Sequence, residues 1–531
     1  MVIEFICRLR RDVVYLHIEV LDTTLRDGSQ GSNVSFTPND KIRIAIALDD
    51  LGVDYIEGGW PGSNPKDRSF FQEIKEYKLS HSSIAAFGST KHKGSKTEDD
   101  PSIKSIIDSG AETAVIFGKA WELHVKDVLK VTNDENLDLI YDSVNYLKSS
   151  GIEVIFDAEH FYKGYASNSE YAMLVLKTAA DAGSRTLVLC DTTGSTAPNE
   201  VHSVTKKVVE NADAKVGVHM HNDIGCAVAN TMMGVVAGAR HIQGTVNGIG
   251  ERSGNADIIT AIPALAFSLG HDTVKQENLK KLKSLSSLLY SIMNVEPNPG
   301  QPFVGDNAFA HKGGIHVDAM RKNAAAYEHI DPQLVGNMRK IIISDMSGAS
   351  NLLNYAEALG LMIGKSDARL KQALNVIKSL EKEGYSFDAA EASAMLIMLK
   401  EMGVYRPYIR LGSWKTESAG TRSMAMIKAG EITETAEGPG PVNAMDVAIR
   451  KAFTKIYPEI SKVVLIDYRV VLPGHVKNTQ STVRVVMEFS DGREKWRSTG
   501  VSKNVINASL DSLLDGFNYY LWKNKVEDRK Y

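Results

Sequence analysis

The chain has 531 residues, of which 43% are hydrophobic and 24% charged, an ordinary globular composition that excludes a disordered, collagen-like or coiled-coil protein. Its 61 basic and 65 acidic residues give a net charge of −4, so no basic excess points to nucleic acid or an anionic membrane as a partner. A chain of this length is expected to fold into about three to four domains.

The three cysteines share no CxxC spacing and are too few for a disulfide framework, which indicates a reducing, cytoplasmic compartment. At the N-terminus a short apolar stretch carrying Glu4 precedes the basic residues, the reverse of a signal peptide. Residues 1–17 are therefore expected to form an N-terminal extension. The longest apolar runs, 261–269 and 392–399, are far shorter than the roughly 18 residues of a membrane helix.

Short β-branched runs alternate with amphipathic, helix-length segments in the first half of the chain. The eight runs are 17–21, 54–57, 83–87, 113–117, 153–156, 186–189, 215–219 and 241–246. Eight strand–helix units in about 260 residues predict a (β/α)8 barrel, here over residues 18–275. A doubly wound open sheet is the alternative, but it usually has fewer strands, and no GxGxxG follows the first run.

The pattern changes after residue 275. Residues 276–424 are expected to form mostly helical linker subdomains, with helices over 279–292, 365–382 and 389–400 and a polar linker or loop over 410–424. Residues 425–531 are expected to form a separate α+β domain. Its predicted strands are 425–427, 463–472 and 481–489, its predicted helices are 442–456 and 508–523, and a hairpin turn is expected at 490–492.

The barrel prediction indicates where chemistry belongs, because barrel active sites lie at the carboxyl ends of the strands. Polar side chains gather at these ends: Arg26, Asp27, Gln30, Glu57, Asp157, Glu159, Asp191, Thr192, His219 and His221. Asp157 and Asp191 are equally suited to capping the helices that follow them. Glu159 could serve as a general base or bond a neighbour.

His219 and His221 are the sharpest feature, since residues two apart on a strand point to the same face. Two imidazoles in a barrel mouth can share one metal ion, which Asp27 could complete. Taken alone, the two histidines are better explained as ordinary polar loop residues. The carboxylates expected at neighbouring strand ends favour a metal site instead. Arg26, next to Asp27, would suit a developing oxyanion or a surface salt bridge.

Three motifs make the sequence recognisable: LDTTLRDGSQ at 21–30, HMHND at 219–223 and GERSGN at 250–255. They resemble the signature of the 2-isopropylmalate, homocitrate and citramalate synthase family, barrel enzymes that condense acetyl-CoA with a 2-oxo acid. Residues 307–316 resemble the family's second-subdomain motif, and 438–444 and 500–504 its carboxyl-terminal regulatory domain. The resemblance extends from residue 18 to about 525.

The resemblance implies a role for individual residues. Asp27, His219, His221 and Asn255 match the ligands of a divalent metal ion, for which Zn²⁺, Mn²⁺, Co²⁺ and Mg²⁺ remain open. Arg26 matches the arginine that steadies the oxyanion, and Thr192, with Gln30 beside the site, matches a contact to the oxo acid. Glu159 and His316 match residues that take part in acetyl-CoA activation. In the family, the residue matching His316 acts at the partner subunit's site, with Asp318 supporting it. The resemblance therefore implies a homodimer.

Residues 55–67, 156–161 and 328–336 resemble most the citramalate synthases, which use pyruvate. A tyrosine expected of isopropylmalate synthases is missing near 335–339, which weakens that interpretation. The resemblance further implies isoleucine biosynthesis, with isoleucine as an effector of the last domain; a plain dimerisation module is the alternative. Other open functions are a synthase using 2-oxoisovalerate or 2-oxoglutarate, a retro-aldol lyase, and a non-catalytic metabolite-binding paralogue.

Overall fold

The computed structural model describes residues 17–343, 349–358, 361, 363–364, 366–388, 390–473 and 481–529. The extension predicted for residues 1–17 falls, except for His17, outside the described residues. The chain divides into two compact units. The first runs to Phe309 and includes Ile330–Met338, and the second comprises Ala310–His329 and everything from Arg339 onward.

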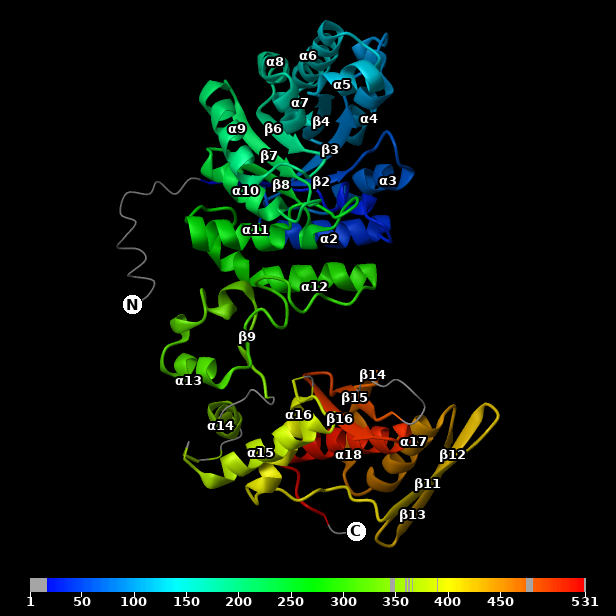
Figure 1. Ribbon diagram of the computed structural model, residues 1–531. Coiled ribbons are helices and arrows are strands. Elements are labelled where there is room, and N and C mark those ends of the chain that lie inside the picture. Colours follow the sequence, from blue (N-terminus) through cyan, green and yellow to red (C-terminus); the bar gives the residue numbers. More distant parts are fainter. Residues whose placement is uncertain are drawn as a thin grey trace. The chain divides into compact units, whose positions relative to one another are not determined.

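The first unit is built on a closed barrel of eight parallel strands in sequence order, which confirms the predicted fold (Figure 1). The strands are β1 Glu19–Asp22, β2 Tyr55–Gly59, β3 Ser83–Ser89, β4 Thr113–Lys119, β5 Glu153–Glu159, β6 Thr186–Asp191, β7 Lys215–Met220 and β8 His241–Gly244. The barrel closes because β1 pairs with both β2 and β8. All eight predicted β-branched runs therefore fall on barrel strands.

Helices connect successive strands and cover the outside of the barrel (Figure 1). They are α2 Pro38–Leu51, α3 Pro65–Glu73, α4 Pro101–Ser109, α5 Glu122–His124, α6 Asn133–Ser149, α7 Phe161–Ser167, α8 Ser169–Asp181, α9 Pro198–Asn211, α10 Ala227–Val236 and α11 Ile258–Ala264. After them comes α12 Leu282–Met293, where the sequence predicted a helix over 279–292. A 3-10 turn over Gln276–Lys281 precedes α12.

Local signals explain why the helices begin and end where they do. Thr37 and Asp40 form a reciprocal capping box at the start of α2, with Pro38 in its first turn. The helix ends at Gly52, whose φ of 92° lies in the left-handed region that other residues adopt only at a cost. The apolar faces of such helices pack on the outside of the barrel, and a separate small cluster, including Leu21 and Val188, fills its interior.

An ion network closes the amino-terminal end of the barrel around Glu19. Its carboxylate pairs with Arg185 at 2.7 Å and with Lys215, and His241 Nδ1 lies 3.5 Å from Oε2. Burial opposes ionisation of Glu19, but the basic groups of His241 and Lys215 outweigh it and lower the pKa to about 2 from an ordinary 4.5. The ionised carboxylate therefore stabilises the folded barrel.

We expect Glu19→Gln to lower the free energy of unfolding at pH 7 by ~3 kcal/mol. Because the folded-state pKa lies below the ordinary value, the carboxylate's contribution is complete above pH 4.5 and disappears as the pH falls toward 2. Urea unfolding of both proteins across this range measures the difference. A gap between them that stays constant from pH 7 to pH 2 would contradict this account.

The second unit starts with small elements and then becomes helical. Its elements up to residue 401 are β9 Ala310–His311, α13 Gly314–Lys322, β10 Lys340–Ile341, α14 Ala349–Ala358, α15 Ala368–Lys382 and α16 Glu391–Glu401. α15 and α16 lie where the sequence predicted helices over 365–382 and 389–400. A compact apolar cluster including Leu370, Ile377 and Leu399 holds α14, α15 and α16 together.

The remainder of the second unit consists of two successive strand–strand–strand–helix repeats. The first is β11 Ser413–Ala419, β12 Arg422–Ala429, β13 Ile432–Gly438 and α17 Pro441–Phe453; the second is β14 Val464–Val471, β15 Val483–Ser490, β16 Lys495–Ser502 and α18 Val505–Lys523. Both sheets are antiparallel meanders, and one apolar core unites the repeats. The turn predicted at 490–492 does join the hairpin of β15 and β16.

The predicted linker over 410–424 is wrong in structural terms, because most of it is strand. β11 pairs with β12 from Ser413 opposite Lys428 to Ala419 opposite Arg422. Most β11 side chains are exposed, so a polar sequence costs little in this strand. The sheet-containing part of the unit therefore begins about a dozen residues earlier than the predicted start at 425.

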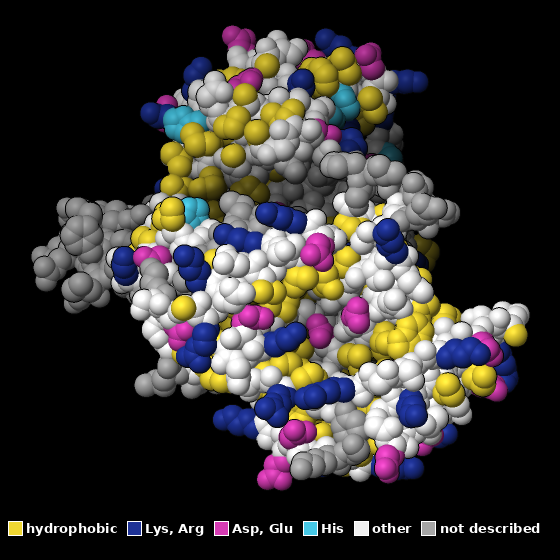
Figure 2. Space-filling model, turned by 60° about the horizontal axis from the view of Figure 1, so that its bottom comes forward, with side chains coloured by type: hydrophobic (Ala, Val, Ile, Leu, Met, Phe, Trp, Pro, Cys, Tyr) yellow, Lys and Arg dark blue, Asp and Glu magenta, His cyan; other side chains and the backbone are white. Residues whose placement is uncertain are grey.

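Charges of both signs are intermixed on the face shown in Figure 2, where Lys and Arg lie among Asp, Glu and apolar side chains. This distribution accords with the small net charge of −4. Within the described part of the chain, no helix combines the length and the apolar character needed to cross a membrane.

Candidate active site

A polar hollow of about 200 Å³ lies at the carboxyl ends of the barrel strands. It is lined by Arg26, Asp27, Gln30, Trp60, Phe87, Phe117, Asp157, Glu159, Cys190, Thr192, His219, His221 and Glu251. These residues come from β3, β4, β5, β6 and β7 and from loops that follow β1, β2, β6, β7 and β8. The structure thus brings together most of the polar residues that the sequence predicted at the strand ends.

Asp27, His219 and His221 form a buried cluster whose ligand atoms all lie within 4.8 Å of one another. Asp27 Oδ2 is 3.3 Å from His219 Nε2 and 3.9 Å from His221 Nε2, and the two Nε2 atoms are 3.3 Å apart. His219 is on β7 and His221 lies two residues further on, so both rings face the barrel mouth. One carboxylate and two imidazoles at this spacing could hold a divalent metal ion.

Asn255, the fourth predicted ligand, is paired through its backbone with His221 of this cluster. Its backbone forms an antiparallel bridge with His221, and its side-chain Nδ2 donates to the carbonyl of Ile249. The remaining amide oxygen is buried and has no hydrogen-bond partner among the described residues. A buried oxygen without a partner is costly unless a ligand satisfies it, so Asn255 also fits a cation site.

Electrostatics within the cluster favour an ionised Asp27 and a neutral His221. Burial opposes ionisation of Asp27, but the charge of Arg26, at 3.4 Å, and the contact with His219 outweigh it and hold the pKa well below its ordinary range. Burial and the neighbouring His219 lower the pKa of His221 to about 4. His221 is therefore neutral near pH 7 and has a lone pair to offer a metal ion.

Arg26 is held in place from two sides. Its Nε donates to Glu57 Oε2 at 2.7 Å, and its guanidinium carbon lies 3.8 Å from the centre of the Phe87 ring. Glu57, which the sequence placed at the end of the second strand, is fully buried in the middle of β2, which continues to Gly59. This support orients a permanent positive charge beside Asp27, where negative charge developing on a bound oxygen would be stabilised.

Glu159 and Thr192 lie on the side of the hollow formed by β5 and β6. Glu159, the last residue of β5, forms an ion pair with Lys119 at the end of β4. Thr192 Oγ1 accepts a hydrogen bond from the backbone N–H of His160 at 2.9 Å. Because this bond uses a lone pair of the hydroxyl, its proton remains free to donate to a bound anion.

Sequence reasoning missed the aromatic wall of the hollow. Trp60 packs edge-on against Phe87 and Phe117 with ring centres 5.4 and 5.7 Å away, and these two rings are stacked on each other. Phe87 lies on β3 and Phe117 on β4. Two residues before each, Ala85 and Val115 belong to the cluster that fills the barrel interior. The alternation of inward and outward positions along each strand could have identified them.

Sequence reasoning also missed Gln243, the third residue of β8. It is buried between His219 and Asp157, with hydrogen-bonding distances of 2.8 and 2.9 Å. A glutamine beside the apolar Ile242 in a fully buried strand was the signal available. Asp157, for which the sequence left a site residue and a helix cap equally open, faces the hollow. Asp191 accepts from the backbone N–H of Thr196, just ahead of α9.

The predicted catalytic residues His316 and Asp318 belong to α13 in the second compact unit. His316 is exposed and stacks on Tyr327 with ring centres 4.3 Å apart. Asp318 accepts a hydrogen bond from Ser350 and pairs with Lys322. Their part in the chemistry stays a prediction. Gln30 is exposed at the rim of the hollow in the first unit.

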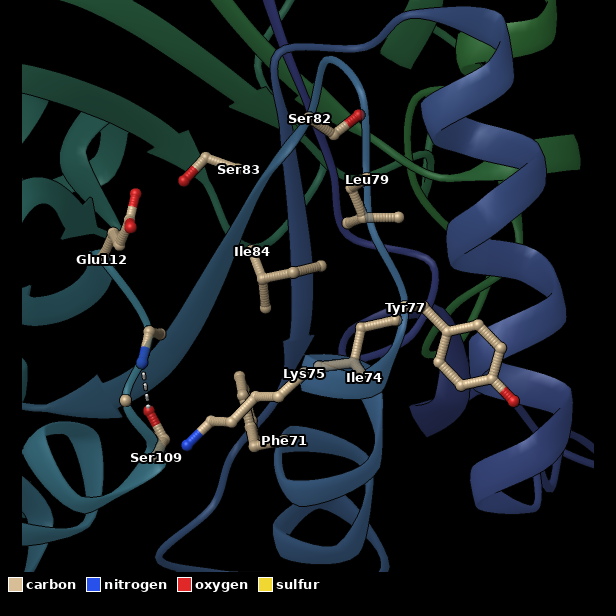
Figure 3. Close-up of a pocket in the computed structure, with 12 residues that line it drawn as sticks. Phe71, Ile74, Lys75, Tyr77, Leu79, Ser82, Ser83, Ile84, Ser109 and Glu112 are labelled. Carbon is tan, nitrogen blue, oxygen red and sulfur yellow. Dashed lines mark hydrogen bonds between the residues drawn. The ribbon is translucent and has the colours of Figure 1, made fainter.

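A separate hollow of about 240 Å³ lies at the opposite end of the barrel (Figure 3). Its walls include Phe71 of α3, Ser83 at the start of β3 and Glu112 just before β4, so it opens at the amino ends of these strands. In Figure 3 the hydroxyl of Ser109 accepts the backbone N–H of Ala111. Because chemistry in such barrels takes place at the carboxyl ends, this hollow is not the candidate site.

Comparisons with known proteins agree with this architecture. Residues 17–289 match the HMGL-like family, residues 303–385 the homocitrate synthase post-HMGL domain-like family and residues 388–521 the LeuA allosteric (dimerisation) domain. The family boundaries also place the start of the last domain earlier than the predicted residue 425.

Named relatives align along nearly the whole chain. The (R)-citramalate synthase of Sulfolobus acidocaldarius is 57% identical over 96% of this chain and 98% of its own, and that of Aquifex aeolicus is 47% identical over 96% and 99%. A 2-isopropylmalate synthase of Methanocaldococcus jannaschii is 31% identical over 96% and 95%. The chain therefore belongs to the (R)-citramalate synthase group of the 2-isopropylmalate and homocitrate synthase family, whose members condense acetyl-CoA with a 2-oxo acid.

Proposed function

We propose that this protein condenses acetyl-CoA with pyruvate to form (R)-citramalate, with hydrolysis of the thioester and release of free CoA. The observation that carries the proposal is the sequence identity of 57%, over almost the full length, to a named (R)-citramalate synthase. The cluster of Asp27, His219 and His221, with Arg26 in the same hollow, supports a catalytic protein over a plain metabolite binder.

We propose that Asp27, His219, His221 and Asn255 hold one divalent ion. The convergence of three ligand atoms and the unpartnered amide oxygen of Asn255 support this assignment. Zn²⁺, Mn²⁺, Co²⁺ and Mg²⁺ all remain candidates for this mixed nitrogen and oxygen donor set. When bound, the ion would orient the 2-oxo acid and polarise its keto carbonyl.

The reaction breaks a C–H bond of the acetyl methyl group, forms a C–C bond to the keto carbon of pyruvate and moves negative charge onto the keto oxygen. We propose that Arg26, held by Glu57 and Phe87, stabilises this charge. Glu159 is proposed to take part in removing the methyl proton, together with His316 and Asp318 contributed by the partner subunit. Water then cleaves the C–S bond of the thioester, and the thiol leaves as CoA.

Thr192 is proposed to bind the carboxylate of pyruvate through its free hydroxyl proton, with Gln30 as a further contact at the rim. The aromatic wall of Trp60, Phe87 and Phe117 faces the same hollow and offers an apolar surface to a methyl group. A hollow of about 200 Å³ suits a small 2-oxo acid. These features support a small 2-oxo acid with an apolar side chain over a dicarboxylic acid.

Release of free CoA from acetyl-CoA, measured with added divalent metal, tests the proposal. Pyruvate, 2-oxobutyrate, 2-oxoisovalerate and 2-oxoglutarate are compared in parallel. We expect pyruvate to have the highest kcat/KM, since each misplaced methylene changes binding by ~1–3 kcal/mol, or roughly 10- to 200-fold. Preference for 2-oxoisovalerate would make the protein an isopropylmalate synthase, and no release with any acid would favour a lyase or a binder.

We further propose that the protein is a homodimer and that strand β14 lies in the contact between subunits. β14 is at the edge of its sheet, and it exposes a row of apolar side chains: Val464, Ile466, Tyr468, Val470 and Val471. An exposed apolar edge strand is a liability unless another chain covers it. The match of residues 388–521 to a dimerisation domain supports the same conclusion.

Val470→Lys is expected to convert the dimer to a monomer, because the substitution places a charge where an apolar side chain is 48% exposed. Sedimentation velocity of the full chain measures the mass. Val128→Lys, at a position 58% exposed in the barrel unit, is the matched control and should leave the dimer intact. A Val470→Lys protein that stays dimeric would show that the interface lies elsewhere.

The last part of the chain is proposed to bind isoleucine, the end product of the pathway to which (R)-citramalate would lead. The protein is proposed to work in the cytoplasm. Support comes from the match to an allosteric domain family. We expect L-isoleucine to lower the rate of CoA release and to raise the unfolding temperature of the second unit, with L-leucine as the control amino acid. No response to isoleucine would leave this domain as a dimerisation module.

A further inference from the structure

Three buried side chains from different parts of the barrel form a continuous chain of hydrogen bonds. Gln243 of β8 lies beside His219 of β7, and its Oε1 is 2.8 Å from His219 Nδ1. The Nε2 of the same amide donates to Oδ1 of Asp157, on β5, at 2.9 Å. The exposed fractions of Asp157, Gln243 and His219 are 4%, 1% and 4%, so water does not compete for these bonds.

The chemistry of the three groups determines which atom donates and which accepts in each of these hydrogen bonds. A carboxylate can only accept hydrogen bonds, so Asp157 takes the NH₂ end of the Gln243 amide. The amide oxygen is then left facing His219, and an oxygen without a proton requires that His219 Nδ1 carry one. In the neutral ring the lone pair therefore belongs to Nε2, the atom that lies 3.3 Å from both Asp27 Oδ2 and His221 Nε2.

We infer that Asp157 and Gln243 form a relay that fixes His219 with its proton on Nδ1 and its Nε2 lone pair turned toward Asp27 and His221. With Nδ1 bonded to Gln243, Nε2 is the nitrogen of His219 that is left to face Asp27 and His221 and to bind a cation there. The inference rests on the proposed function only in taking Asp27, His219 and His221 as the metal site. Asp157 and Gln243 act as positioning residues.

Titration of the metal-free protein with Co²⁺, followed by its visible absorption, tests the relay. Gln243→Met keeps the length of the side chain and removes both hydrogen bonds. We expect it to weaken Co²⁺ binding by ~10- to 100-fold, as for other groups that orient a metal-binding histidine. Gln301→Met is the matched control. Gln301 is also buried and bonds Asn247 and Asp257, not a histidine, so Co²⁺ affinity should change by less than about twofold.

A pair of double variants separates the relay from simple packing. In Asp157→Asn/Gln243→Glu the donor and acceptor exchange places: the new amide donates to the new carboxylate, which still accepts the proton of His219 Nδ1. We expect its Co²⁺ affinity to recover to within about tenfold of the unsubstituted protein. Asp157→Asn/Gln243→Met has the same first substitution but no acceptor for the proton of His219 Nδ1. Its Co²⁺ affinity should remain as weak as that of Gln243→Met.

Two results would overturn the relay: Co²⁺ binding by Gln243→Met as tight as that of the Gln301→Met control, or equal affinities of the two double variants. Thermal unfolding of each metal-free protein checks that it is folded. CoA release by Gln243→Met should return toward that of the unsubstituted protein at saturating metal, because the substitution affects loading of the site. Failure of the proposed function would appear as no CoA release by the unsubstituted protein, while the Co²⁺ results would stand by themselves.

Discussion

Asp27→Ala is expected to lower kcat/KM for CoA release by ~10³-fold or more. The carboxylate is the only acidic member of the cluster with His219 and His221 among the described residues, and its loss removes both a ligand and the negative charge that attracts a cation. Stabilisation of transition-state charge by a metal ion amounts to several kcal/mol, and ~1.4 kcal/mol corresponds to a tenfold change in rate. The fold should survive, because Arg26 keeps Glu57 as its partner.

The measurement is steady-state release of CoA with pyruvate as the acceptor, combined with a Co²⁺ titration. Asp142→Ala is the control, since Asp142 is a partly exposed aspartate of α6 that pairs with Lys91, away from the hollow. Its activity should remain within about twofold of the unsubstituted protein. If Asp27→Ala retained both its turnover and its Co²⁺ affinity, the metal would have to bind elsewhere.

Arg26→Lys is expected to lower kcat by ~10²- to 10³-fold, the cost of removing one well-placed donor to a developing oxyanion. A lysine keeps the positive charge but has no planar fork of donors to bond Glu57 while lying flat on Phe87. Its ammonium would therefore be free to move away from the reacting oxygen. Because Asp27, His219 and His221 are unchanged, Co²⁺ affinity should change far less than kcat.

This difference between kcat and metal affinity separates Arg26 from the metal ligands. Arg43→Lys, at a half-exposed position of α2, is the matched control and should have no measurable effect on either quantity. A loss of Co²⁺ affinity as large as the loss of kcat would assign Arg26 to the assembly of the metal site. An unchanged kcat would leave its charge without a catalytic role.

Much of the fold could be predicted because local patterns encode it. β-branched runs separated by amphipathic segments are repeated eight times, and caps such as the one at Thr37 mark the helix starts. β11 could not be predicted by the same criterion. Its side chains are mostly exposed and polar. Trp414 is its one hydrophobic side chain packed, partly buried, against the core, so backbone pairing with β12 mainly defines the strand. Hydrophobic periodicity detects burial, and a strand with so little buried apolar surface leaves only a weak signal.

The sequence by itself determined the barrel, the spacing that turns His219 and His221 to one face, and the motif that carries Arg26 and Asp27. The tertiary structure alone decided which side chains support them. Gln243 meets Asp157 although 86 residues separate them, and Arg26 meets Glu57 across 31. Such contacts arise only when strands distant in sequence converge inside a closed barrel, where buried polar groups must find partners that no local pattern specifies.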